Sequence, residues 1–288
     1  MPPFFASPMH KEILHRAWPI ILSGLSVPLL GAVDTAVIGH LPDASYLGAV
    51  AIGAMIMSFL YWGFGFLRMG TTGFVSQAAG ANNADEIRTV LIQSLMLGFL
   101  ISLIIFALQI PILKLALHLV SSNVQVEQGA STYFNFRVWG APAVLFNYTL
   151  LGFFIGIGNT RAALFTQIFM NVVNIGLDVI FVLWLGMEIQ GVALASVIAE
   201  YSAVFVGFIL VVKELNRVGG GWRKNSILSI SNAMKLLKVN LDIFIRTILL
   251  IFSFAYFTAE AAKIGEEALA ATAVLMNFMH FLSFGLDG

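Results

Sequence analysis

The feature of this sequence that most constrains its fold is a series of long apolar stretches. A helix needs roughly 20 apolar residues to cross a bilayer. Eight stretches reach or approach that length: residues 13–39, 46–70, 88–114, 128–155, 161–185, 191–213, 234–259 and 268–288. Only 10% of the residues are charged, against about 25% in an average soluble domain. The sequence therefore predicts an all-α protein that crosses a membrane several times, with the lipid bilayer as part of its solvent.

The net charge and the absence of certain motifs exclude several classes of function. The net charge is zero, so no basic excess exists to neutralise the phosphates of a nucleic acid. Cysteine is absent, which excludes disulfides and thiolate metal sites. The sequence has no Walker loop and no His-Glu-x-x-His or Gly-x-Ser-x-Gly motif. The glycine-dense residues 152–158 end a membrane stretch and do not follow a strand, so they do not predict a nucleotide site. Because these motifs are missing, the sequence predicts no enzyme activity, metal or cofactor.

The distribution of lysine and arginine along the chain indicates how the protein is oriented in the membrane. With the N-terminus in the cytoplasm, 11 basic residues fall on the cytoplasmic side of the membrane and 2 on the outer side. Cytoplasmic loops carry such an excess, so we expect a multi-pass protein of the cytoplasmic membrane with its N-terminus inside. Six of the basic residues lie in residues 213–238, which we interpret as a cytoplasmic linker between two units.

A weak internal repeat supports two units. Shifting the chain by 222 residues aligns residues 47–66 with 269–288, and seven of the 20 aligned pairs are identical. We therefore expect a six-helix N-terminal lobe and the start of the linker in residues 1–222. Residues 223–288 would hold the end of the linker and the first two helices of a parallel second six-helix repeat. A complete repeat would extend the chain to roughly 444 residues, so we expect this chain to be truncated at its C-terminus.

Acidic side chains at membrane depth are candidate functional residues, because each costs about 2.5–3.5 kcal/mol to insert. Asp34 lies well inside the first stretch, six residues after Pro28. Its carboxylate could hold a proton or bind a hard cation, and the alternative is a hydrogen-bonded packing role. Pro28 is either a functional hinge or a simple packing kink.

The stretch 161–185 carries a polar stripe. Gln167, Asn171, Asn174 and Asp178 follow spacings of four, three and four residues, so they share one face of a helix. Such a face cannot contact lipid, and it points to a neighbouring helix or to a wet cavity. Asn174 and Asp178 offer oxygen ligands for sodium or for a proton relay, and interhelical hydrogen bonding is the alternative.

A second polar pair occurs in the stretch 191–213. Ser196 and Glu200 are one helical turn apart. Glu200 is a possible relay or cavity-lining residue, as are Gln167 and Asn171. Ser196 alone could instead bond back to a helix carbonyl.

Several segments together carry a family resemblance. Residues 62–73 (Trp-Gly-Phe-Gly-Phe-Leu-Arg-Met-Gly-Thr-Thr-Gly) resemble a signature of the DinF-like branch of the multidrug and toxic compound extrusion (MATE) family. Further segments similar to that branch are residues 33–39, 156–161, 174–178, 191–201, 241–247 and 286–288. The resemblance covers essentially the whole chain, and its specificity comes from the order and spacing of the segments.

The resemblance implies a function. Members have twelve helices in two six-helix lobes and export lipophilic, often cationic drugs or toxins in exchange for inward H⁺ or Na⁺. It assigns the coupling cation to Asp34, Asn174, Asp178 and Ser196, where the family often has threonine at the last position. Two alternatives stay open. A flippase for lipid-linked pyrophosphates would need several buried basic residues, whereas only Arg137 and Arg246 lie well inside the predicted spans. A non-transporting fragment or scaffold would tolerate replacement of Asp34 and Asp178.

Overall fold

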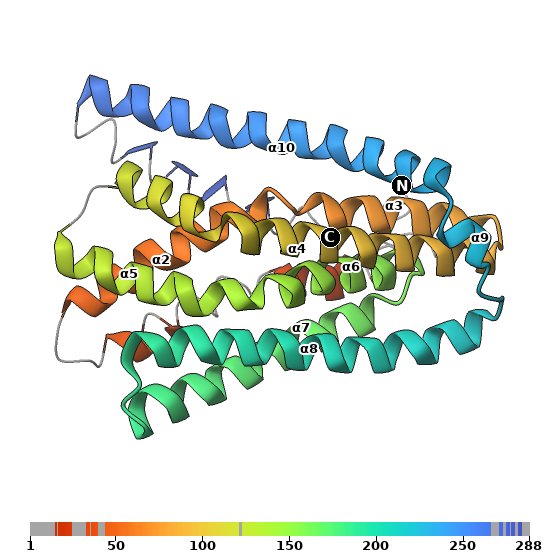
Figure 1. Ribbon diagram of the computed structural model, residues 1–288, viewed down its shortest axis with the longest axis horizontal. Helices are drawn as coiled ribbons and strands as arrows, with labels where there is room; N and C mark the ends of the chain where they lie inside the picture. The colour runs from red at the N-terminus through yellow and green to blue at the C-terminus, as the bar shows by residue number, and fades with distance from the viewer. Residues whose placement is uncertain are drawn as a thin grey trace, which may run out of the picture.

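The computed structural model shows a bundle of long helices. It describes residues 15, 17–24, 33–34, 36–39, 44–120, 123–265, 271–272, 275–276, 278–279 and 282–283, and these contain no strand. Its main elements are α2 (Ala44–Trp62), α3 (Phe66–Gly80), α4 (Ala84–Val120), α5 (Val124–Arg137), α6 (Ala141–Gly156), α7 (Thr160–Asp178), α8 (Glu188–Val218), α9 (Lys224–Ile227) and α10 (Ile230–Ile264). The helices lie lengthwise beside one another, with α10 along one edge next to α3 (Figure 1).

Six helical stretches in the described residues are long and apolar enough to cross a membrane. They are Ser45–Gly80, Ala84–Val120, Val124–Gly156, Thr160–Trp184, Glu188–Val218 and Met234–Thr258. Each corresponds to one predicted span, which confirms an all-α, multi-pass membrane protein. The first and last predicted spans, 13–39 and 268–288, are described only in part, and Pro28 lies outside the described residues.

Two spans predicted as single helices are interrupted. The span predicted to end at Gly70 instead turns at residues 63–65 and continues as α3 to Gly80. The span predicted over 128–155 contains a short 3₁₀ turn, Val138–Gly140, between α5 and α6. Pro142 explains the second break, because a proline ring clashes with the carbonyl four residues earlier and is best tolerated in the first turn of a helix.

Glycines allow α6 to pack closely on α3. An ideal Cβ on Gly152 would lie 2.5 Å from the backbone oxygen of Arg68, and one on Gly156 would lie 2.7 Å from Cβ of Val75. Gly152 and Gly156 are four residues apart, the small-xxx-small spacing that brings membrane helices together. The glycine-dense segment at the end of α6 is therefore a helix-packing surface.

The predicted linker folds back on the start of α4. Arg88 of α4 donates from Nε to the Gly219 carbonyl at 2.8 Å and from Nη2 to the Leu215 carbonyl at 2.7 Å. Its guanidinium also lies 4.9 Å from the centre of the Trp222 ring, a cation–π contact.

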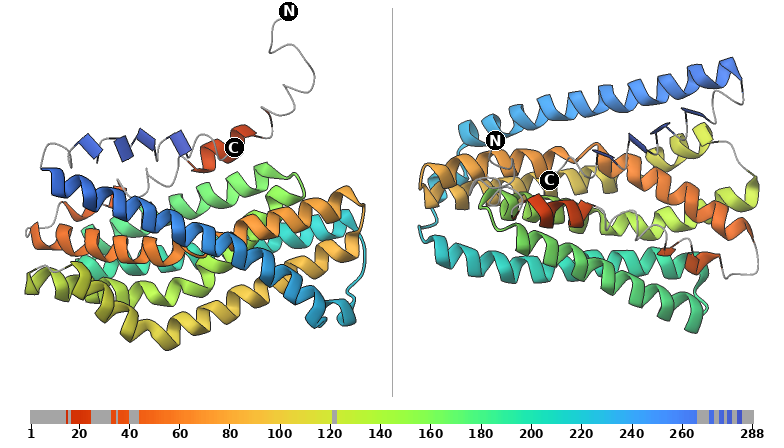
Figure 2. Two further views of the ribbon diagram at one scale, coloured as in Figure 1. Left: turned by 90° about the horizontal axis from the view of Figure 1, so that it is seen from above. Right: turned by 180° about the vertical axis from the view of Figure 1, so that it is seen from behind.

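Two more side chains of α4 hold the same segment. Asp85 forms an ion pair with Arg223 and accepts a hydrogen bond from the backbone N–H of Gly221 at 2.7 Å. Gln93 donates to the carbonyls of Ser226 and Ile227 at 3.2 and 3.1 Å. The chain from α8 through α9 is thus fastened to one end of the bundle before α10 begins, as the views in Figures 1 and 2 both show.

Candidate functional site

The polar stripe on α7 faces the interior of the bundle, as its spacing predicts. Gln167, Asn171, Asn174 and Asp178 are all buried, and Asp178 is completely inaccessible. Phe165 and Val172 on the opposite face of α7 are 54% and 62% exposed. The predicted division of α7 into an exposed apolar side and a buried polar side is therefore confirmed.

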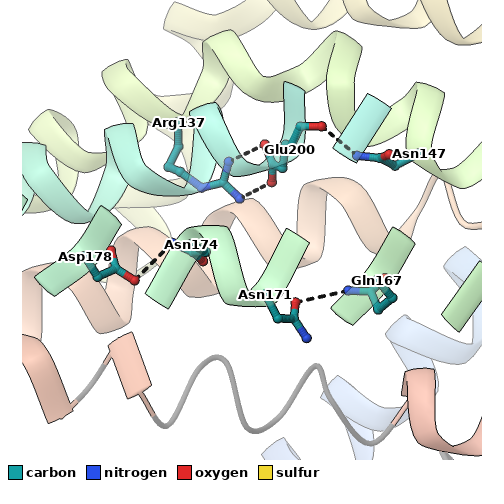
Figure 3. Close-up of polar contacts among 7 residues, drawn as sticks. All are labelled: Arg137, Asn147, Gln167, Asn171, Asn174, Asp178 and Glu200. Atoms are coloured by element: carbon teal, nitrogen blue, oxygen red, sulfur yellow. Dashed lines mark hydrogen bonds and ion pairs between the residues drawn. The ribbon is translucent and has the colours of Figure 1, made fainter. Parts of the chain in front are cut away.

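Hydrogen bonds link the stripe into two pairs. Asn174 donates from Nδ2 to Oδ2 of Asp178 at 3.0 Å, and Gln167 donates from Nε2 to Oδ1 of Asn171 at 3.3 Å (Figure 3). Both pairs join residues four apart, so α7 itself sets their geometry. Gln167 also lines a small pocket between α6, α7 and α8 together with Asn147 and Thr166.

Asp178 lies at a change of helix type. The regular α-helix ends at Asp178 and is followed directly by a π-helical segment, Val179–Trp184. Wider π-helical turns are rare and often occur at functional sites, because they alter which side chains share a face. The irregularity here changes the helix geometry immediately beyond the buried carboxylate.

The structure brings Asp34 and Asp178 together. Their carboxyl groups, from segments 144 residues apart in sequence, lie within hydrogen-bonding reach of each other. Each has one oxygen, Oδ1, that is buried and has no hydrogen-bond partner. Two ionised carboxylates this close repel each other, so a proton or a cation between them is strongly favoured. Carboxylate and amide oxygens are also the ligands that hard cations prefer.

A buried ion pair lies beside the stripe. Arg137, the last residue of α5, donates from Nη1 to Oε2 of Glu200 at 2.8 Å and from Nη2 to Oε1 at 2.7 Å (Figure 3). The two side chains are only 12% and 11% exposed. Asn147 of α6 donates to the backbone carbonyl of Glu200 at 3.1 Å, which fixes that turn of α8. Glu200, predicted as a possible relay or cavity-lining residue, is bound on both carboxylate oxygens.

The remaining candidate residues are less closely joined to this cluster. Ser196 is buried on α8, one turn before Glu200. Within the described residues it forms no hydrogen bond to Asn174 or Asp178, which bond to each other on α7. Pro28, predicted as a hinge, is outside the described residues.

Arg137 belongs to this cluster but is not among the site candidates that the sequence predicts. The sequence points to carboxylates, amides and a hydroxyl as candidate site residues, and Arg137 enters only as one of two basic residues well inside the predicted spans. An arginine in the middle of the predicted span 128–155 carries the same cost of insertion as a carboxylate. Its position was therefore a sufficient signal for a buried partner of opposite charge.

Comparison with known proteins places this geometry in a family. Residues 19–180 match the MatE family profile. Over 284 residues the chain is 41% identical to DNA damage-inducible protein F of Escherichia coli K12, and over 209 residues it is 26% identical to "Probable multidrug resistance protein NorM" of Bacillus subtilis. These alignments cover 99% and 71% of this chain. They cover 62% of the E. coli protein and 46% of the B. subtilis protein, so the chain spans less than two thirds of each relative.

A solved structure shares the fold. The bent form of the Vibrio cholerae MATE transporter VcmN superposes with a TM-score of 0.78 at 23% sequence identity. The superposition covers 96% of this chain and 62% of that one. The arrangement of the long helices is therefore that of a MATE transporter.

Proposed function

The chain belongs to the MATE family, whose members are transporters and not enzymes, and on this premise we propose that it acts in a cation-coupled efflux antiporter. In this proposal the transporter exports lipophilic, often cationic small organic molecules across the cytoplasmic membrane in exchange for H⁺ or Na⁺. The observation that carries the proposal is the close approach of the carboxyl groups of Asp34 and Asp178, each with a buried Oδ1.

The coupling step follows from the chemistry of that pair. Asp34 and Asp178 supply negative charge, while Asn174 and Ser196 supply neutral oxygen atoms. An arriving proton or Na⁺ relieves the repulsion between the two carboxylates and lets their helices draw together. In the proposal the segment 13–39 then bends near Pro28, the cavity shrinks and the substrate leaves. Cation binding and substrate binding are thereby coupled, because both depend on the same conformational change.

The proposed topology has the N-terminus in the cytoplasm, a six-helix lobe in residues 1–222 and the start of a second lobe in residues 223–288. Its support is the gathering of basic residues at the end of the bundle that carries α9. Arg88 contacts the segment after α8 there, and Arg223 pairs with Asp85. Lys213, Arg217 and Lys224 are near the same end by their places in α8 and α9. Basic residues concentrate on the cytoplasmic side of membrane proteins.

A flippase for lipid-linked pyrophosphates fits less well. Such a transporter needs free basic side chains to bind phosphate oxygens. Arg137 has its guanidinium fork occupied by Glu200. The neighbourhood of the α7 stripe therefore favours a positively charged ligand over a phosphate.

The test is export of a cationic dye by the complete gene product in proteoliposomes. A pH gradient or a Na⁺ gradient drives ethidium transport, and Asp34→Asn and Asp178→Asn are each compared with the parent protein. We expect both variants to lose gradient-driven export. Glu188→Gln, the same chemical change at an exposed carboxylate at the start of α8, is the matched control and should export normally. Normal gradient-driven export by Asp34→Asn would contradict the proposal and favour a scaffold role for the pair.

A further inference from the structure

The guanidinium of Arg137 lies near enough to Asp34 and Asp178 to act electrostatically on both. A free arginine at this place would be the strongest competitor of a coupling cation, because its planar fork matches a carboxylate and it stays charged at every physiological pH. In the structure, however, both η nitrogens of Arg137 donate to Glu200. Its Nε is buried and has no hydrogen-bond partner.

From this arrangement we propose that Glu200 is a positioning residue that holds Arg137 away from the Asp34–Asp178 pair and so keeps the pair available to the coupling cation. The inference rests on the proposed function and adds to it a role for two residues that do not themselves bind the cation. Arg137 acts as a fixed internal counter-charge, and Glu200 determines which carboxylate it pairs with.

The backbone next to the Arg137–Glu200 ion pair leaves room for both side chains and holds them in place. Gly140, in the 3₁₀ turn between α5 and α6, faces the pair: an ideal Cβ at this position would contact Oε2 of Glu200 and lie 3.0 Å from Nη1 of Arg137. Any larger residue would push the carboxylate or the guanidinium aside. Asn147 holds the Glu200 backbone from the other side. Three elements, α5, α6 and α8, thus fix the pair in one place.

The position along the bundle brings the pair near the level of the candidate cation site. Asn159, just before α7, donates to Glu214 of α8 at 2.7 Å, so these two residues mark one level of the bundle. From that level Asp178 lies about 28 Å along α7 and Glu200 about 21 Å along α8, at 1.5 Å per residue. The ion pair therefore lies within about two helical turns of Asp178 along the bundle, beside the turn of α7 that carries Asn174 (Figure 3).

Besides Glu200 and the two aspartates, the described ionisable side chains that interact with the guanidinium are tyrosines. Tyrosine hydroxyls carry no charge at neutral pH, so they do not compete with Glu200 for the arginine as an ion would. With Glu200 paired, the charge of Arg137 is largely cancelled at short range. Without Glu200, its best remaining acceptors are the two aspartates. The ionisable groups that interact with Arg137 are Tyr61 of α2, Tyr133 of α5, Tyr148 of α6, Asp178 of α7, Glu200 of α8 and Asp34.

The test measures cation binding without a transport substrate. The melting temperature of the purified complete gene product is recorded against Na⁺ concentration at constant ionic strength, and against pH without Na⁺. The cation concentration that gives half of the stabilisation reports the apparent affinity. We expect Glu200→Gln to raise that concentration at least tenfold for the cation that stabilises the parent protein. The double variant Arg137→Gln/Glu200→Gln, which also removes the competing charge, should return to within about threefold of the parent.

Each outcome separates the inference from simpler explanations. If Glu200 only stabilises the fold, Glu200→Gln lowers the melting temperature at every cation concentration and leaves the half-point unchanged, which would overturn the inference. A double variant shifted as far as Glu200→Gln would overturn it too, because Arg137 would then not be the competitor. Should Glu200→Gln not yield folded protein, Glu200→Asp takes its place: the inference requires an intermediate shift, and an unchanged half-point contradicts it. A parent protein without any cation-dependent stabilisation would contradict the proposed coupling itself, and with it the inference.

Discussion

The guanidinium of Arg88, near the start of α4, donates a 2.8 Å hydrogen bond to the carbonyl of Gly219, the residue that ends α8. The two residues are 131 positions apart in sequence. Arg88 is itself buried, and its second bond, to the Leu215 carbonyl, satisfies another group at the end of α8. A segment whose sequence indicates only a hydrophilic linker is therefore fastened to the helix bundle.

Replacing Arg88 with alanine should release this segment. Hydrogen bonds to a charged group are worth about 1.5–3 kcal/mol each, and the contact with Trp222 is lost as well. We expect trypsin to cut after Arg223 or Lys224 at least tenfold faster in Arg88→Ala than in the parent protein. Arg217→Ala is the matched control, because Arg217 is 69% exposed and pairs with Glu214 three residues away on the same helix. Equal cleavage rates in both variants would mean that Arg88 does not fasten the segment.

Gly152→Ala tests the close contact of α6 with α3. Its Cβ would meet the backbone oxygen of Arg68, which cannot rotate away as a side chain could. Overpacking of this kind costs typically about 1–3 kcal/mol, so we expect a lower melting temperature and less folded protein in the membrane fraction. Gly73→Ala is the control, since among the described residues no atom outside the surrounding α3 backbone lies within 4 Å of its Cβ position. A Gly152→Ala protein as stable as the control would show that the two helices can separate without cost.

Asn174→Ala tests whether the stripe on α7 has one functional part or two. Asn174 donates to Asp178, whereas Asn171 accepts from Gln167. Removal of a hydrogen bond to a charged carboxylate changes its free energy by about 1.5–3 kcal/mol, roughly tenfold or more in affinity. We therefore expect Asn174→Ala to weaken cation-dependent thermal stabilisation at least tenfold, and Asn171→Ala to change it by less than threefold. Equal effects would assign the whole stripe to helix packing.

The sequence predicts the long helices well because the cost of exposing backbone groups and charges in lipid leaves few alternatives. The buried face of α7 followed from spacing alone, and so did the joint placement of Asn174 and Asp178. Breaks within spans were harder to predict. The turn at residues 63–65 and the 3₁₀ turn before Pro142 depend on how neighbouring helices re-satisfy the freed backbone groups, which a single helix does not reveal.

The partners of each charged residue could not be read from the sequence. Arg137 and Glu200 are 63 residues apart, and their pairing depends on how α5 packs against α8. Hydropathy places both residues inside the membrane but gives no partner. The same limit applies to Asp34 and Asp178, which the family resemblance, and not their spacing, assigned to one site.

The most direct test of the central claim is a double-mutant cycle on the two aspartates. Gradient-driven ethidium export by the complete gene product is measured in proteoliposomes for Asp34→Asn, Asp178→Asn and the double variant, each at equal protein density. Residues that bind one cation together act as a unit, so their effects are not additive. Our account predicts that each single variant loses as much export as the double variant. Full export by either single variant, or losses that simply multiply in the double variant, would contradict a shared cation site at Asp34 and Asp178.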